Sequence, residues 1–357
     1  MAPHSPSTSV IAAISAAVGG ITTYFALRAY GRRREKTLCK FAIPASLLAD
    51  DCPYREEIQV AVRLALEAGE NMKSHSDTKG TLQGYESEHG LDIAHKSAEI
   101  DFATAVDILN EKVISDGIKK AFPSHTIIGE ETVGTGEVPP LGSSPTWIVD
   151  PIDGTTNFAS GQPLTAVSIG LCDGGRPVLG VAFAPITGEL YLAITGRGAF
   201  RNGVRIHSTN QTSVSIKRLS DAVVCCEFGY ARSDQAVRDM VGAAEHILQH
   251  GCRTLRQLGS GVLDICYVAS GRIDVVYTGV ADEGWKPWDY CAAMVVAEES
   301  GCTIRSLKGA PGKIDASDEF DKDGQVVQGS SFNIYSKSMI CGVNKTIVEE
   351  CRKTVLG

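Results

Sequence analysis

The order of the predicted elements indicates an α+β fold that is built in layers. Apolar residues recur at helical spacing up to residue 121, short apolar runs alternate with hairpin turns in residues 164–206, and helices and strands alternate beyond residue 210. This order, helices, then an antiparallel sheet, then mixed elements, is typical of layered α+β proteins rather than of a repeated strand–helix–strand unit. The 357-residue sequence contains no evident internal repeat.

Two helices are predicted at the start of the globular sequence. The first covers residues 56–74, where the apolar positions are Ile58, Val62, Ala65, Leu66 and Gly69. Residues 74–91 are polar and contain glycine, which predicts a loop. The second helix covers residues 102–121, and its pattern is formed by Ala105, Ile108, Leu109, Lys112, Val113 and Ile118.

Turn signals then divide residues 164–206 into short strands. They lie at residues 173–175, 185–188, 196–198 and 202–203, and each contains glycine. Such spacing predicts an antiparallel meander. Further along the chain we expect a helix over residues 235–250, a strand over 274–277 and a helix over 290–300.

The first 55 residues differ from the rest of the chain. Residues 10–27 carry no charge, and Arg28 and Arg32–Arg34 follow at once. We predict a leader over residues 1–55, with a membrane anchor at 10–27 and a linker from 35, followed by a globular domain over 56–357 that is subdivided near residue 210. The basic cluster would hold that domain on the cytosolic side. A disordered or cleaved leader is the alternative interpretation.

Composition narrows the class of protein. Hydrophobic residues make up 43% of the chain, which is enough for a sizeable core. The net charge of −8, with no basic stripe after residue 40, argues against a nucleic-acid partner. The 11 cysteines are odd in number and show neither a CxxC motif nor zinc-like spacing, so we interpret them as reduced thiols of an intracellular protein.

The most informative segment is residues 147–158, WIVDPIDGTTNF. A short apolar strand ends at Asp150, and Asp153 follows after a turn that Pro151 would stiffen. Two carboxylates so close together repel each other unless a hard cation lies between them, and the Ile152 carbonyl could be a further oxygen ligand. Gly154 and the threonines after it should open a helix whose free N–H groups favour phosphate. The alternative is an ordinary strand-to-helix turn with an Asp cap.

Two other acidic positions share this character. Glu130 follows the predicted strand 126–129, and Asp289 stands where an apolar helix begins. Taken alone, a solvated acidic loop and a helix N-cap are the more common interpretations. Three acidic groups at element ends, each beside a glycine or a tryptophan, instead favour a shared metal site.

These segments, GEE at 129–131, WIVDPIDGTTNF at 147–158 and WDYCAAMVVAEESG at 288–301, resemble the signature motifs of the inositol monophosphatase family. The likeness covers roughly residues 56–350. It implies a layered α-β-α-β-α sandwich of the inositol monophosphatase and fructose bisphosphatase type, usually dimeric. It also implies a lithium-sensitive phosphatase with two or three Mg²⁺ ions, which hydrolyses a small polyol phosphate, inositol monophosphate first, through a metal-activated water.

The resemblance also implies roles for individual residues. The metal ligands would be Glu130, Asp150, Asp153, Asp289 and the Ile152 carbonyl. Glu130 and Thr155 would position and activate the attacking water, with Asp107 in support. The substrate would contact Asp153, Gly154, Thr155, Gly259, Ser260, Gly261 and Asp282. Lys96 matches a lysine of a flexible segment in the family.

One stretch departs from the family pattern. The spacing over residues 280–287 differs from that of the animal enzymes, so the acidic contact to the polyol hydroxyls falls on Asp282 or on Glu283.

Several alternative functions stay open. Another sugar phosphatase, for example one acting on galactose 1-phosphate, or a bisphosphate nucleotidase is an alternative, although the TTNF ending argues against the nucleotidase. A membrane-tethered scaffold without activity is a further alternative, which the intact acidic residues disfavour.

Overall fold

Two large β-sheets organise the computed structural model, which describes residues 41–76, 94–95, 102–208, 216–282, 284–308 and 332–357. The first sheet has seven strands in the order β3-β4-β5-β6-β7-β8-β9. They are β3 (Thr126–Gly129), β4 (Thr146–Asp153), β5 (Ala166–Asp173), β6 (Arg176–Ala184), β7 (Glu189–Ile194), β8 (Gly198–Arg201) and β9 (Val204–Ile206). β3 and β4 are parallel and all other neighbours are antiparallel, so the predicted meander is confirmed.

The second sheet has five strands in the order β11-β10-β12-β14-β13. They are β10 (Val223–Glu227), β11 (Thr254–Arg256), β12 (Val275–Thr278), β13 (Thr303–Arg305) and β14 (Met339–Gly342). β10 runs parallel to both of its neighbours, whereas β14 runs antiparallel to both of its own. The strands of this mixed sheet come from the part of the chain beyond residue 210, where helices and strands were predicted to alternate. A separate pair, β1 (Ala94–His95) and β2 (Phe102–Ala103), is antiparallel.

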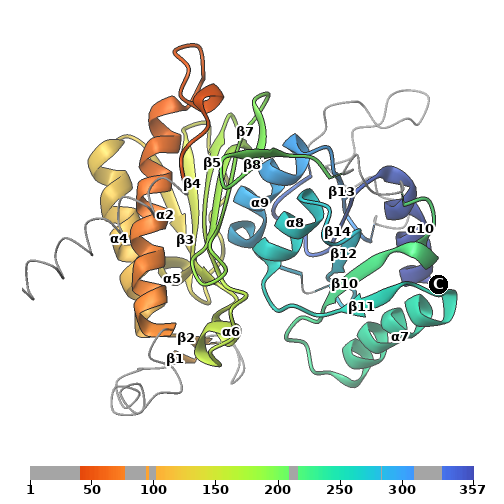
Figure 1. Cartoon of the computed structure of the whole chain (residues 1–357). Coiled ribbons are helices and arrows are strands. Elements are labelled where there is room, and N and C mark those ends of the chain that lie inside the picture. Colours follow the sequence, from red (N-terminus) through yellow and green to blue (C-terminus); the bar gives the residue numbers. More distant parts are fainter. Residues whose placement is uncertain (1–40, 77–93, 96–101, 209–215, 283, 309–331) are drawn as a thin grey trace, which may run out of the picture. The chain divides into compact units, whose positions relative to one another are not determined.

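The longer helices form three layers with the sheets between them (Figure 1). Helices α2 (Arg55–Ser76) and α4 (Ala105–Ala121) pack on the seven-stranded sheet, α8 (Gly261–Ala269) and α9 (Pro287–Glu299) lie between the sheets, and α7 (Asp234–His250) and α10 (Lys345–Leu356) cover the five-stranded sheet. The short helices are η1 (Ala45–Leu47), α5 (Glu130–Val133), α6 (Thr155–Ala159) and η3 (Leu219–Asp221). The expected α-β-α-β-α sandwich is confirmed.

The middle layer is deeply buried. Ten of the thirteen residues of α9 are buried, because a sheet covers the helix on each side. Gly180 on β6 permits this contact, since a Cβ atom there would lie 2.1 Å from the Ala292 carbonyl oxygen. The backbone of α9 is therefore held close to the seven-stranded sheet, which fixes the position of its first turn.

The helix predicted over residues 56–74 is confirmed, but the face predicted for the second helix is wrong. α4 begins at Ala105, and Ile108 and Leu109 are exposed by 55% and 49% of their surface. Its buried face instead carries three polar residues, Asp107, Asn110 and Glu111, followed by Ile114 and Ile118. Apolar periodicity misplaced the face because buried polar groups with hydrogen-bond partners take positions that apolar residues usually occupy.

The other predicted elements shift by a few residues. α7 and β12 lie at the predicted places, whereas α9 begins at Pro287, three residues before the predicted start. Within the predicted linker, Leu47 and Cys52 are buried. The uncharged segment 10–27 lies outside the described residues, and within those residues no helix has the length and apolar character to cross a membrane.

Candidate active site

Asp150 and Asp153 come from one strand, β4, where its pairing with β5 becomes irregular. Asp150 pairs with Ser168 and Asp153 with Ala166, so three steps along β4 match two steps along β5. An extra residue in one strand is a β-bulge, which re-aims side chains, and Pro151 has no N–H to continue the ladder. The predicted proline turn is therefore wrong in its geometry, because the strand continues to Asp153, but the bulge has the same effect of bringing both carboxylates together.

Asp289 joins these two residues from the middle layer. Carboxylate oxygens of Asp150, Asp153 and Asp289 all lie within 4.8 Å of one another. Asp289 is the third residue of α9, and its Oδ2 accepts the Lys286 backbone N–H at 2.6 Å. Glu130, the first residue of α5, shares a hydrogen bond with Asp150. Four acidic side chains thus meet between the seven-stranded sheet and α9.

Burial and mutual repulsion raise the pKa values of this group. Burial, then the charge of Glu130, raises the pKa of Asp150 well above 3.8. Burial also raises the pKa of Asp153 to about 7, although hydrogen bonds from Ser260 and Val262 oppose the shift. Burial and the charge of Asp153 raise the pKa of Asp289. A divalent cation among these oxygens would reverse the effect, and an all-oxygen donor set suits a hard cation such as Mg²⁺.

The first turn of α8 holds Asp153 in place. Ser260 Oγ donates to Asp153 Oδ2, and the backbone N–H groups of Gly261 and Val262 donate to the same carboxylate at 3.1 Å each. Ser260 is also the N-cap of α8, because its side chain accepts the Leu263 N–H. Asp153 therefore connects the bulged strand of one sheet to the helix that packs between the two sheets.

The turn after Asp153 leads directly into α6. Gly154 has φ +81°, and a Cβ atom there would lie 2.9 Å from the Gly259 carbonyl oxygen, so both the conformation and the space favour glycine. Thr155 Oγ1 lies 3.3 Å from Asp107 Oδ1 and 3.0 Å from the Ile152 carbonyl oxygen. Asp107 in turn is fully buried and closes a capping box with Thr104. Thr155 is thus oriented by two acceptors behind it.

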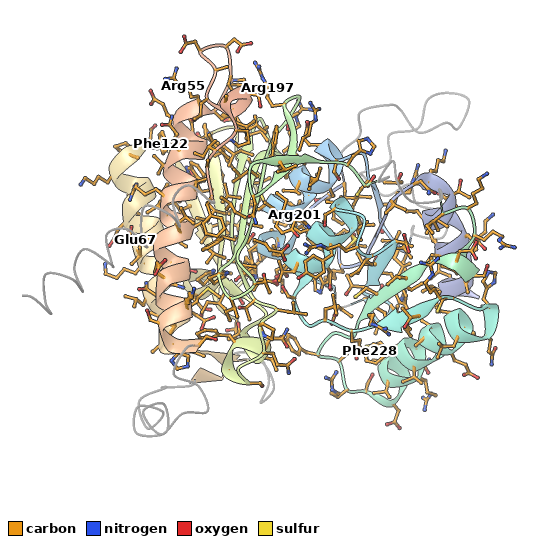
Figure 2. All side chains as sticks on the ribbon, in the orientation of Figure 1. Arg55, Glu67, Phe122, Arg197, Arg201 and Phe228 are labelled. Carbon is orange, nitrogen blue, oxygen red and sulfur yellow. The ribbon has the colours of Figure 1, made fainter. Side chains whose placement is uncertain are left out.

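A cavity of about 800 Å³ opens above these residues. Its lining includes the acidic group, the Gly154–Thr155 turn and the Gly259–Gly261 segment. It also includes Phe228 and Tyr230 from the loop after β10, and Phe228 can be located in Figure 2. A cavity of this size accommodates a small ligand.

Comparison with known proteins decides the family. The model of the inositol monophosphatase family matches residues 54–342. The chain belongs to the inositol monophosphatase family. Inositol monophosphatase 1 of Bos taurus is 31% identical over 85% of this chain and 95% of its own. Inositol monophosphatase 2 of Solanum lycopersicum is 38% identical over 71% and 89%. The structure of a Thermotoga maritima IMPase has a TM-score of 0.63, at 27% identity over 84% and 97%. The chain is accordingly a phosphatase that hydrolyses phosphate monoesters, in a family of generally metal-dependent enzymes.

In this inositol monophosphatase-type site, most predicted positions lie on the cavity wall. These are Glu130, Asp150, Ile152, Asp153, Gly154, Thr155, Gly259, Ser260, Gly261, Asp282 and Asp289. Asp107 lies behind Thr155 rather than on the wall. Asp282 lies at the edge, with its side chain 70% exposed and its Oδ2 3.1 Å from Lys308 Nζ. Lys96 and Glu283 lie outside the described residues.

Sequence reasoning missed two acids that support the site, the buried Glu111 and the half-buried Glu227. Glu111 accepts the backbone N–H groups of Glu131 and Thr132 at 2.6 and 2.8 Å, and so holds the short helix that begins with Glu130. Glu227 accepts the N–H groups of Leu258 and Gly259. For Glu111 a signal existed, because it lies four residues after Asp107 and hence on the same helix face. For Glu227 no local pattern pointed to the contact.

Proposed function

We propose that this chain catalyses the Mg²⁺-dependent hydrolysis of a small polyol phosphate monoester, with inositol monophosphate as the best substrate. The observation that carries the proposal is the meeting of Asp150, Asp153 and Asp289 within 4.8 Å at the base of a cavity that Gly154 and Thr155 also line. An anionic phosphate would be repelled by these carboxylates alone. Cations held by the same carboxylates would give the site the opposite charge.

The acidic group provides the ligands for two or three Mg²⁺ ions. Glu130, Asp150, Asp153, Asp289 and the Ile152 carbonyl would hold them, and all offer oxygen, which Mg²⁺ prefers. When bound, magnesium supplies charge neutralisation for the phosphate and its leaving oxygen and makes water more acidic. The hydrogen bonds from Ser260, Gly261 and Val262 keep Asp153 in one orientation, which favours a defined ligand geometry.

Thr155 and Glu130 are suited to orient the attacking water. The Thr155 hydroxyl has two acceptors behind it, Asp107 Oδ1 and the Ile152 carbonyl oxygen, so its oxygen is free to accept a hydrogen bond from water. Glu130 lines the cavity and can accept the water proton. The free N–H groups around Gly154 and Thr155 would bind phosphate oxygens and align the ester bond opposite the water.

Asp282 is the proposed contact to the polyol hydroxyls. A carboxylate accepts two neighbouring hydroxyl donors well, and hydrogen bonds to a charged acceptor are the stronger kind. In the described residues Asp282 has an ion pair with Lys308 and high exposure, so it can turn toward a substrate at small cost. Its place on the cavity wall supports this role.

A second candidate substrate class has one observation in its favour. The exposed aromatic rings of Phe228 and Tyr230 line the same cavity, with exposures of 39% and 52%. Aromatic rings of this kind stack on a nucleobase. A bisphosphate nucleotide therefore stays a competitor to the polyol phosphate, whereas the metal chemistry would be the same for both.

A substrate panel tests the proposal. Purified protein with Mg²⁺ should release phosphate from inositol monophosphate with a higher kcat/KM than from galactose 1-phosphate, an adenosine bisphosphate or an aryl phosphate. Chelation of the metal should abolish all four activities, and lithium should inhibit them. If a nucleotide were the best substrate, the proposed polyol phosphate substrate would be wrong, although the phosphatase activity would stand. Full activity in chelator would instead refute the proposed Mg²⁺ dependence.

Two properties of the whole chain belong to the same proposal. The segment 10–27 would anchor a cytosolic catalytic domain over residues 56–357, and two copies would form a homodimer. Carbonate extraction of membranes tests the anchor, since an anchored chain stays in the pellet. Light scattering of the detergent-purified chain tests the dimer, and a single-copy mass would contradict it.

A further inference from the structure

Asp264 is a buried carboxyl group that is not part of the acidic group formed by Glu130, Asp150, Asp153 and Asp289. It does not line the cavity either. It lies in the first turn of α8 and has no exposed surface. Its Oδ1 accepts the Cys225 thiol at 3.5 Å, whereas its Oδ2 has no hydrogen-bond donor among the described residues. A buried carboxylate oxygen without a donor is costly, so the ionised form of Asp264 is poorly accommodated here.

Glu227, at the end of β10, is the acid that faces Asp264. Oxygens of the two carboxyl groups and the Cys225 sulfur lie within 4.8 Å of one another. Glu227 Oε1 accepts two backbone N–H groups, from Leu258 at 2.7 Å and from Gly259 at 2.9 Å. Glu227 therefore accepts hydrogen bonds from the backbone of the loop that contains Leu258 and Gly259. Burial, then the charges of Glu227 and Asp153, raises the pKa of Asp264 well above 3.8, with a side-chain hydrogen bond to Glu227 adding to the shift.

The segment that Glu227 holds leads directly to the acidic cluster. The Leu258 carbonyl accepts a hydrogen bond from Asn157 Nδ2 at 2.7 Å, and Gly259 lines the cavity with φ +75°. The next three residues are the donors to Asp153. A shift of residues 258–261 would hence change both the cavity wall and the orientation of Asp153.

We propose that Asp264 is a positioning residue that works as a neutral acid. Its carboxyl O–H donates to the Glu227 carboxylate, and this acid–carboxylate pair fixes residues 258–261 against Asp153 and the substrate. Three acidic groups, Cys225, Glu227 and Asp264, then carry one negative charge, which the two N–H groups of the loop match. This inference rests on the proposed metal-dependent function, because Asp264 would affect activity through the orientation of Asp153, a proposed Mg²⁺ ligand.

Three variants on one helix test the positioning role. Asp264→Leu removes the donor at similar volume, and we expect KM and the Mg²⁺ concentration for half-maximal activity to rise by roughly 10-fold. Asp264→Asn keeps a neutral donor to Glu227 and should stay within about threefold of the wild type. Val268→Ala, a buried cavity variant on α8, reports what a loss of stability alone does, and should leave both constants unchanged.

All activities are measured where circular dichroism shows each variant folded. Unchanged constants in Asp264→Leu would overturn the proposal even if its melting temperature fell. It would equally be overturned if Asp264→Asn were as impaired as Asp264→Leu, because an ionised Asp264 would then be required.

Infrared spectroscopy tests the protonation state without any assay of activity. In the Mg²⁺-loaded wild type we expect a carbonyl band of a protonated carboxylic acid that disappears in Asp264→Asn and persists in Val268→Ala. Absence of that band would refute the neutral acid whatever the substrate proves to be. Stoichiometric zinc in the purified wild type that is lost in Cys225→Ser would refute it too, since the same oxygens would then be metal ligands. An inactive wild type that shows the band would instead count against the proposed function alone.

Discussion

The seven-stranded and five-stranded sheets contribute to the site in different ways. From the seven-stranded sheet, Asp150 and Asp153 leave one bulged strand, and Glu130 follows its parallel neighbour β3. Around the five-stranded sheet, Glu227 stands at the end of β10 and Ser260 caps α8, whereas Asp289 joins the acidic residues from α9, which packs against both sheets. The first region concentrates acidic ligands within one short segment, whereas the second supplies single groups from several elements.

This difference separates metal binding from positioning. Ligands on one strand keep their mutual geometry as long as the sheet is intact. Groups at the end of β10 and at the start of α8 keep their place only while α8 stays packed between the sheets. Changes to the acidic residues of the seven-stranded region, or to Asp289, should therefore abolish catalysis, and other changes around the five-stranded sheet should alter affinity and specificity.

The largest effect is expected for Asp150→Asn. The variant removes one charge from the acidic group but keeps its shape, so the fold should persist while kcat falls by roughly 10²–10³-fold. The measurement is kcat for inositol monophosphate at saturating Mg²⁺, with circular dichroism to verify folding. Asp116→Asn, an exposed acid on α4, is the control. Turnover like that of the wild type in Asp150→Asn would remove Asp150 from the proposed ligands.

Asp282→Ala should affect affinity rather than turnover. Loss of one hydrogen bond to a charged group costs about 1.5–3 kcal/mol, which corresponds to a rise in KM of roughly 10- to 150-fold for inositol monophosphate. An aryl phosphate, which lacks the hydroxyls, should lose little. Lys308→Ala, which removes the ion-pair partner of Asp282, is the matched control and should leave KM nearly unchanged. An equal loss for both substrates would place Asp282 in support of the metal site or the fold.

Ser260→Ala should have a smaller effect, because two backbone donors to Asp153 remain. Loss of the side-chain donor should raise the Mg²⁺ concentration for half-maximal activity by about 10-fold, with little change in kcat at saturating metal. Ser260→Thr keeps the hydroxyl and should restore the wild-type value. If Ser260→Ala bound Mg²⁺ as well as the wild type, the Ser260 hydroxyl would not be needed to orient Asp153, and the two backbone donors of α8 would be sufficient.

How much of the site could be predicted follows the same division. Residues 147–158 carry two acids, a proline and a glycine in sequence, so local chemistry alone indicated a metal and phosphate site there. The predicted turn was a bulge, but both are local devices of one strand and lead to the same side-chain placement. The order of helices, meander and mixed elements likewise predicted the layers.

The side-chain contacts around the five-stranded sheet could not be predicted from local patterns, because they join residues far apart in the sequence. Glu227 and Gly259 are 32 residues apart, and Asp153 and Ser260 are 107 apart. Only the packing of α8 between the sheets brings such pairs together, and no spacing rule reports it. Buried acids such as Asp107 and Glu111 have a related cause, since their partners, rather than their polarity, decide their burial.

The smallest effect expected is a shift of thermal stability with pH in metal-free protein. The pKa of Asp153 rises from 3.8 to about 7 in the fold, so its protonated form favours folding. Its contribution is fully present below pH 3.8 and is lost as the pH rises toward 7. In chelator, the melting temperature of the wild type minus that of Asp153→Asn should therefore fall over this interval, by several °C in order of magnitude.

The stabilisation by added Mg²⁺ should grow over the same interval, because protons and cations compete for the same oxygens. The comparison with Asp153→Asn cancels the titration of surface acids. A flat difference would mean that Asp153 stays ionised without metal, held by its hydrogen bonds from α8 rather than by a cation.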